Sequence, residues 1–220
     1  MIIFHLFALL IDAVLAAEAY HFLKKRNALR IIQEEADREG NKKYVLLCFV
    51  IAMMSVLAYV YGVTHAEKTF LQAVTDSAVM AWVLLIGYID WKEHVIPNDL
   101  ILIAMVFWMI VTVLEIVVGQ GNIRNVLLYS LVGFFVVGFV LLAVALIAKS
   151  ALGMGDVKMF AVLGLFFGLF GAYSILLVTV VTMALVSLML LAFKKVTTKT
   201  ALPMAPFTFL GLLIYLLSGV

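Results

Sequence analysis

Long runs of apolar residues, separated by short polar segments, make up most of the chain. A helix needs about 20 predominantly apolar residues to cross about 30 Å of hydrocarbon. Eight stretches are interpreted as such spans, at residues 1–23, 44–63, 71–89, 99–118, 126–148, 157–172, 173–193 and 203–220. The boundary between the sixth and seventh is inferred from Gly168, Gly171 and a combined length that is too great for one span. The pattern predicts an all-α, multi-pass membrane helix bundle.

The composition supports this prediction and limits the chemistry. Hydrophobic residues make up 66% of the 220 residues, whereas soluble domains contain roughly 45–50% apolar residues. The single cysteine, Cys48, lies within an apolar run, so neither a disulfide framework nor a cysteine-based metal site can form from this chain. The net charge of +2 gives no indication of nucleic-acid binding, and none is expected.

The basic residues predict the orientation, because Lys and Arg collect in the cytoplasmic loops of membrane proteins. With the N-terminus outside, 13 of the 15 Lys and Arg residues lie on the cytoplasmic side, and Lys68 and Arg124 lie outside. Eight spans then place the C-terminus outside as well. In this arrangement the turns that contain Asp90 and Asp156 both lie at the cytoplasmic face. The protein is expected in the plasma (cytoplasmic) membrane.

One hydrophilic stretch, residues 24–43, is long enough to be considered as a separate element. It is mixed in charge and contains a helix-forming piece from 29 to 39, but it is too short to be a domain. We interpret it as a solvated cytoplasmic connector. Asp12 interrupts the first apolar run and no basic residue precedes it, which argues against a cleaved signal peptide. Residues 1–220 are therefore expected to form a single integral membrane domain.

The first polar turn of interest follows the third span and reads Asp90-Trp91-Lys92-Glu93-His94-Val95-Ile96-Pro97-Asn98-Asp99. Pro97 cannot lie inside a helix without the loss of a backbone hydrogen bond, whereas Asn98 or Asp99 can cap the helix that follows. An ionisable residue at the end of a membrane helix invites a functional interpretation. Taken alone, however, Asp90 is more often a solvated boundary residue than a catalytic one.

The second turn is Gly153-Met154-Gly155-Asp156. Its glycines permit backbone conformations or close approaches that other residues cannot adopt, and Asp156 then begins a helix. The plain alternative is that Asp156 is only a helix N-cap. A second carboxylate at the same membrane face favours a catalytic role instead. Two such groups can share one proton and activate one water molecule, as an aspartic protease requires.

Three segments occur in a characteristic order. They are Asp90 followed by Ile96-Pro97-Asn98, then Gly153-Met154-Gly155-Asp156-Val157-Lys158, and finally Leu202-Pro203-Met204-Ala205-Pro206-Phe207 at the start of the last span. In this combination the chain resembles the type IV prepilin leader peptidases and the related archaeal preflagellin peptidases. The resemblance covers a catalytic core from about residue 75 to residue 220.

The resemblance implies a membrane-embedded aspartic endopeptidase with Asp90 and Asp156 as the catalytic pair. Such an enzyme removes the short basic leader from pilin-like precursors at the cytoplasmic face, just before the precursor's hydrophobic helix. A glycine is expected immediately before the cut. The expected partners are therefore the precursor proteins and the lipid bilayer, and the sequence predicts no oligomeric state.

The chain also departs from this family. Many bacterial members resemble one another in a cytoplasmic insertion with paired C-x-x-C clusters and in a Gly-Ser-Phe motif near the N-terminus, and neither is present here. Zinc binding is therefore not expected. The family's second activity, N-methylation of the new pilin terminus, has no support in this sequence. We expect a protease-only form without a cofactor, with S-adenosylmethionine needed only if a methylase activity is retained.

Residues around the two turns are candidates for supporting roles. Lys158 and His94 can favour ionisation of the carboxylate pair, although Lys158 can equally extend to lipid headgroups. Prolines would loosen the start of the last helix, which would help to admit an extended substrate. The motif residues expected beside the pair are Gly153, Gly155, Lys158, Pro97, Asn98, Pro203 and Pro206.

Two polar or small-residue features are assigned structural roles. Asp76 lies 14 residues before Asp90, about 21 Å away along a helix, which is too far for catalysis. It is expected to form a hydrogen bond to a neighbouring helix near the outer surface. Gly164 and Gly168 form a small-x-x-x-small face, which indicates close helix packing.

Two other functional classes stay open. A presenilin-like intramembrane protease also resembles the G-x-G-D element, but that family pairs Tyr directly with Asp and ends with Pro-Ala-Leu. Here Ile89 separates Tyr88 from Asp90, and Pro203 begins Pro-Met-Ala-Pro. A proton-coupled transporter would use the two carboxylates as relay groups. It would be expected to carry them at mid-bilayer and to contain internal repeats, neither of which is clear in this sequence.

Overall fold

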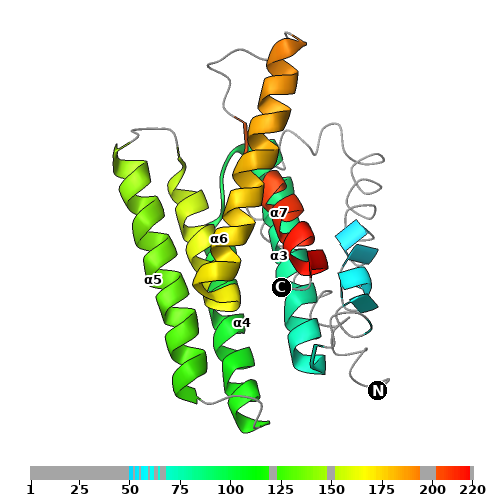
Figure 1. Cartoon of the computed structure of the whole chain (residues 1–220), viewed down its shortest axis with the longest axis vertical. Helices are drawn as coiled ribbons and strands as arrows, with labels where there is room; N and C mark the ends of the chain where they lie inside the picture. The colour runs from blue at the N-terminus through cyan, green and yellow to red at the C-terminus, as the bar shows by residue number, and fades with distance from the viewer. Residues whose placement is uncertain are drawn as a thin grey trace, which may run out of the picture. The chain divides into compact units, whose positions relative to one another are not determined.

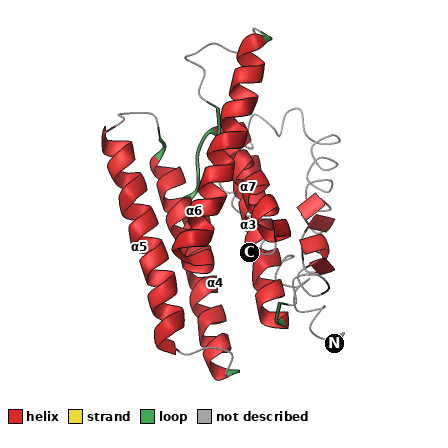
Figure 2. Cartoon of the chain, in the orientation of Figure 1, coloured by secondary structure: helices red, strands yellow, loops and turns green. Residues whose placement is uncertain are grey.

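The computed structural model describes residues 50–118, except 52, 55, 59, 62, 63 and 65–67, together with 123–147, 152–193 and 202–218. These residues are helical or lie in short connections, and none of them is in a strand (Figure 2). The helices are α3 (Phe70–Glu93), α4 (Asn98–Val117), α5 (Ile123–Ile147), α6 (Met154–Ala192) and α7 (Ala205–Ser218). The predicted first span and the connector 24–43 lie outside the described residues, and the second span is described only in part.

The described helices have the length and surface of membrane spans. Helices α3, α4, α5 and α6 are long and apolar enough to cross a membrane, and α7 is a shorter apolar helix. Large apolar side chains face outward, such as Phe139, which is 73% exposed on α5. Such a surface is unfavourable in water but is solvated by lipid. The chain is a multi-pass membrane protein, and the part of it that the structure describes is all-helical, as the hydrophobic pattern predicts.

The chain forms two compact units, residues 1–85 and residues 86–220. The second unit contains the last turns of α3 and all of α4 to α7, and within it α6 packs against α4, α5 and α7. Figure 1 shows that α3 ends, and that α6 both begins and ends, toward the same end of this unit. The turns after α3 and before α6 are therefore on one side of the bundle.

Helix α6 is divided by a sharp bend at Gly168. Its backbone there is non-helical, with φ 64° and ψ −169°, a conformation that glycine adopts without steric cost. The hydroxyl of Tyr129 on α5 donates a hydrogen bond of 3.1 Å to the carbonyl oxygen of Phe167, just before the bend. The predicted turn at 172–173 is thus wrong in position. The change of direction comes at Gly168, where the Tyr129 ring leaves no room for a side chain.

Helices α5 and α6 are in close backbone contact through a pair of glycines. A Cβ atom on Gly164 would lie 2.6 Å from the carbonyl carbon and oxygen of Gly133. A Cβ atom on Gly133 would lie 2.7 Å from the carbonyl carbon of Gly168. The close packing predicted for Gly164 and Gly168 is confirmed, whereas their partner Gly133 was not identified from the sequence.

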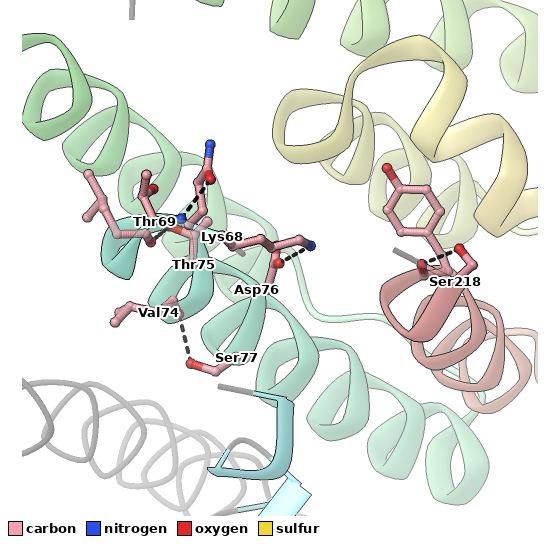
Figure 3. A network of polar contacts seen from close by, with 10 residues as sticks. Lys68, Thr69, Val74, Thr75, Asp76, Ser77 and Ser218 are labelled. Atoms are coloured by element: carbon pink, nitrogen blue, oxygen red, sulfur yellow. Dashed lines mark hydrogen bonds and ion pairs between the residues drawn. The ribbon is translucent and has the colours of Figure 1, made fainter. Parts of the chain in front are cut away.

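Asp76 has a different partner from the one expected. Its carboxylate forms an ion pair of 2.6 Å with the ammonium group of Lys68, which precedes α3 (Figure 3). The prediction of a bond to a neighbouring helix is therefore wrong. The Asp76 side chain is only 13% exposed, and a buried carboxylate requires a compensating charge. The flexible side chain of Lys68 reaches forward along the first turns of α3 to supply it.

The glycine contact between α5 and α6 leads to a stability prediction. Gly133→Ala should lower the unfolding temperature in detergent, because the new methyl group would meet backbone atoms that cannot move aside. Gly138→Ala is the matched control on the same helix, since its methyl group would lie 3.2 Å from the Ala161 side chain. In both variants the helix itself is stabilised by about 1 kcal/mol, because alanine is more favourable than glycine in a helix interior. Equal unfolding temperatures for the two variants would contradict the backbone contact.

Candidate functional site

Asp90 lies in the last turn of α3 and is buried, with 7% of its surface exposed. Its Oδ2 atom accepts a hydrogen bond of 3.1 Å from the backbone N–H of Ala205, the first residue of α7. The backbone of Met204 also forms a hydrogen bond with this carboxylate. The first N–H groups of a helix have no partner within the helix and carry a partial positive charge. The start of α7 is therefore a binding site for the Asp90 carboxylate.

Local sequence explains how α7 comes so close to α3. Gly87 lies one helical turn before Asp90, and a Cβ atom there would be 3.3 Å from the Cα atom of Pro206. Pro203 and Pro206 flank Met204 and Ala205 and have no N–H groups, so the two residues between them supply the donors. The N–H groups of residues 207 and 208 bind the Met204 carbonyl oxygen at 3.0 and 3.1 Å. The helix thus starts with these backbone hydrogen bonds, and the loosening of this start by the prolines stays a prediction.

Asp156 lies in the first turn of α6 but is not its N-cap residue. The N-cap residue is Gly153, so Asp156 is the third residue of the helix, and the plain N-cap interpretation is wrong. The carboxylate folds back toward the cap: the backbone of Gly153 forms a hydrogen bond with it, and a Cβ atom on Gly153 would lie 2.9 Å from Oδ2. The absence of a side chain at residue 153 leaves room for this contact.

The other carboxylate oxygen of Asp156 is unusual. Oδ1 is buried and has no hydrogen-bond partner among the residues that the structure describes. Buried polar atoms normally have a hydrogen-bond partner, because a buried atom without one destabilises the folded protein by roughly 1–3 kcal/mol. Asp90 lies within electrostatic reach and acts on Asp156 as a like charge. Two carboxylates that interact as like charges, one of them with a buried oxygen that has no described partner, are an electrostatic arrangement typical of functional sites.

The turn between α3 and α4 is fixed against the start of α6 by two contacts. A Cβ atom on Gly155 would lie 2.8 Å from the Cβ atom of Ile96, so the two segments touch. The Lys158 ammonium group donates a hydrogen bond of 2.9 Å to the Asn98 side-chain oxygen. Lys158 thus binds the turn that carries Asn98. These contacts hold the end of α3 beside the start of α6, where the two carboxylates lie.

The start of α4 differs in detail from the prediction. Its N-cap residue is the buried Pro97, and no side chain forms a capping hydrogen bond, so neither Asn98 nor Asp99 caps the helix. Asn98 instead accepts the bond from Lys158. His94 leaves the end of α3 with a positive φ of 51°, and its backbone N–H binds the Asp90 carbonyl oxygen at 2.9 Å. When it is protonated, its side chain attracts the Asp90 carboxylate.

Two contributors to the site were missed from the sequence. Gly87 was not noted, although its position three residues before Asp90 places both on one helix face. Ala205 was seen only as part of a motif, because a backbone N–H leaves no mark in the side-chain pattern. Among the residues described, no group of three or more His, Cys, Asp or Glu side chains is arranged to hold a metal ion.

Comparison with known proteins gives one match. Residues 77–188 match the model of the type IV leader peptidase family. This region includes Asp90, Asp156 and the turns on which they lie, and it ends before α7. No curated protein and no solved structure matches the chain.

The contact between Gly155 and Ile96 can be tested by stability alone. Gly155→Ala should destabilise the protein, because its methyl group would overlap the Ile96 side chain. In a chain that carries Ile96→Gly, the same substitution should cost less, which gives a coupling free energy of about 0.5–3 kcal/mol in a double-mutant cycle of unfolding. Additive effects would show that the two turns do not touch.

Proposed function

Because the chain belongs to the type IV leader peptidase family, we propose that it is a membrane-embedded aspartic endopeptidase with Asp90 and Asp156 as its catalytic pair. The observation that carries this proposal is that two carboxylates from different helices interact as like charges. The Asp156 carboxylate also has a buried oxygen without a hydrogen-bond partner among the described residues. The family is one of proteases, and this site supplies the groups that an aspartic protease needs.

The chemistry requires one proton shared by two carboxyl groups. The ionised carboxylate removes a proton from a water molecule as the water oxygen attacks the carbonyl carbon of the scissile peptide bond. The protonated carboxyl group gives its proton to the carbonyl oxygen, which yields a tetrahedral diol. The C–N bond then breaks as the leaving nitrogen receives a proton. No step needs a metal ion or an organic cofactor.

The proposed substrate is a pilin-like precursor with a short basic leader followed by an apolar helix, as the family implies. In the orientation predicted from the basic residues, both turns lie at the cytoplasmic face of the cell membrane, with both termini outside. Both turns lie on the same side of the bundle, which supports this proposal (Figure 1). A scissile bond just outside the bilayer, at the junction of leader and apolar helix, could then enter the site sideways from lipid.

The presenilin-like alternative is less well supported. The family match covers both aspartates and the surrounding helices, and Ile89 separates Tyr88 from Asp90. A proton-coupled transporter is also disfavoured, because the two carboxylates lie at helix ends rather than in helix interiors. N-methylation of the product has no support beyond the family resemblance and is not part of the proposal.

Substitution of either aspartate tests the catalytic pair. Asp90→Asn and Asp156→Asn should each lower kcat/KM for precursor cleavage by about 10⁴-fold or more, and the double variant should be no worse, because the pair acts as one unit. Cleavage is measured by gel shift with purified enzyme and precursor in liposomes. Asp76→Asn is the control, since that carboxylate binds Lys68 and should be dispensable for cleavage.

Thermal unfolding of the same variants checks that each is folded. Full cleavage by a folded Asp90→Asn or Asp156→Asn variant would refute the proposed pair.

Changes in the precursor test the position of the cut. Replacement of the glycine before the cut by phenylalanine should stop processing, because a large side chain would block an extended backbone between the two carboxylates. A shift of the cut site by two helical turns, about 11 Å, into the apolar helix should do the same. Mass spectrometry of the products locates the cut. Efficient cleavage at mid-helix positions would favour the presenilin-like alternative instead.

A further inference from the structure

The two carboxylates have different surroundings, and the difference indicates which of them carries the shared proton. We infer that the start of α7 holds Asp90 as the ionised group that activates water, while Asp156 is the carboxylic acid that donates a proton to the scissile carbonyl oxygen. The backbone N–H of Ala205 is then a positioning group for the reaction. This inference rests on the proposed peptidase function and extends it to the roles of the individual residues.

Asp90 is buried, as is the Oδ1 atom of Asp156, but the surroundings of Asp90 tolerate a negative charge better than those of Asp156 do. Its Oδ2 atom accepts the N–H of Ala205 at 3.1 Å, and the Met204 backbone supplies a further hydrogen bond. Both donors belong to the start of a helix, where the dipole is positive. A protonated His94 adds an attractive interaction from the end of α3. Hydrogen bonds to an ionised group are about twice as strong as those between neutral groups, so these donors bind the carboxylate best when it is charged.

The surroundings of Asp156 favour a proton. Its Oδ1 atom is buried and has no donor among the described residues, so a negative charge there would be poorly solvated. Among the described residues, Asp90 is the titratable group that acts on it, and its charge is repulsive. Lys158 lies on the same helix, but its ammonium group binds Asn98. A proton on Oδ1 would remove the second negative charge and convert a bare oxygen into a hydrogen-bond donor.

These roles give a balanced reaction. Asp90 takes a proton from water while the water oxygen bonds to the carbonyl carbon, and Asp156 gives its proton to the carbonyl oxygen. Asp90 then transfers the proton it gained to the leaving nitrogen as the C–N bond breaks. Asp156 recovers a proton from a hydroxyl of the diol as the new carboxyl group forms. Both residues end in the states in which they began.

The Ala205 N–H can be removed without a change in any catalytic side chain. Ala205→Pro deletes this donor at the first position of a helix, where proline is well tolerated. Ala205 is fully buried, so the added ring atoms need a control. Ala205→Val adds similar bulk and keeps the N–H. A third variant carries lactic acid in place of Ala205, introduced by nonsense suppression, which replaces the N–H by an oxygen and keeps the methyl group.

The measurement is the pH profile of kcat for precursor cleavage in liposomes. Without the Ala205 N–H, a proton binds Asp90 more readily, so the inactive form with two protons persists to higher pH. The acidic limb of the profile should move up by about one pH unit in the proline and lactic acid variants, equivalent to a tenfold change in proton affinity. It should stay in place in Ala205→Val, and the alkaline limb should stay in place in all of them.

Each other outcome overturns the inference. An upward shift of the alkaline limb would make Asp90 the proton donor and reverse the roles. Unchanged limbs in the lactic acid variant, which alters no side chain, would show that the Ala205 N–H does not set the charge of Asp90. If cleavage instead survived in both aspartate-to-asparagine variants, the proposed function itself would fail, which is a different result from either of these.

Discussion

The constraint on which this structure depends is the placement of two carboxylates within electrostatic reach of each other at one end of an apolar helix bundle. Like charges repel, and a buried carboxylate loses its water shell, so the arrangement persists only if the protein supplies donors. The hydrogen bond from Ala205 to Asp90 spans 115 residues of sequence. A hydrogen bond to a charged group contributes about 1.5–3 kcal/mol. The last helix of the described chain is therefore part of the site.

Close packing between helix backbones makes this donor contact geometrically feasible. Gly87 lets α7 approach α3 one turn before Asp90, and Gly155 lets the start of α6 touch Ile96. At the other end of this part of α6, Gly164 lies against Gly133 on α5, and Gly168 allows the sharp bend. In lipid, where apolar side chains gain little from being buried against one another, such small residues give helices the close contact that stabilises them. The same glycines that stabilise the bundle thus position the two aspartates.

The sequence predicted those features that depend on local pattern. The spans 71–89, 99–118 and 126–148 agree with α3, α4 and α5 to within a few residues, because the length of an apolar run is set by the bilayer. The bend of α6 was misplaced, since Gly168 and Gly171 are equally good candidates until the Tyr129 ring is seen against one of them. The partner of Asp76 was also misassigned. A lysine that precedes a helix can reach the first turns of that helix, and charge pattern alone does not show whether it does.

Backbone hydrogen-bond donors and long-range contacts could not be predicted from the sequence. The segment Pro203-Met204-Ala205-Pro206 was interpreted through its prolines, as a place where the helix start is weak. The structure shows the same prolines on either side of two N–H groups that bind Asp90. The family match ends at residue 188, before this segment. Because the Ala205 N–H that binds Asp90 lies beyond that limit, the candidate site extends past the matched region to the start of α7.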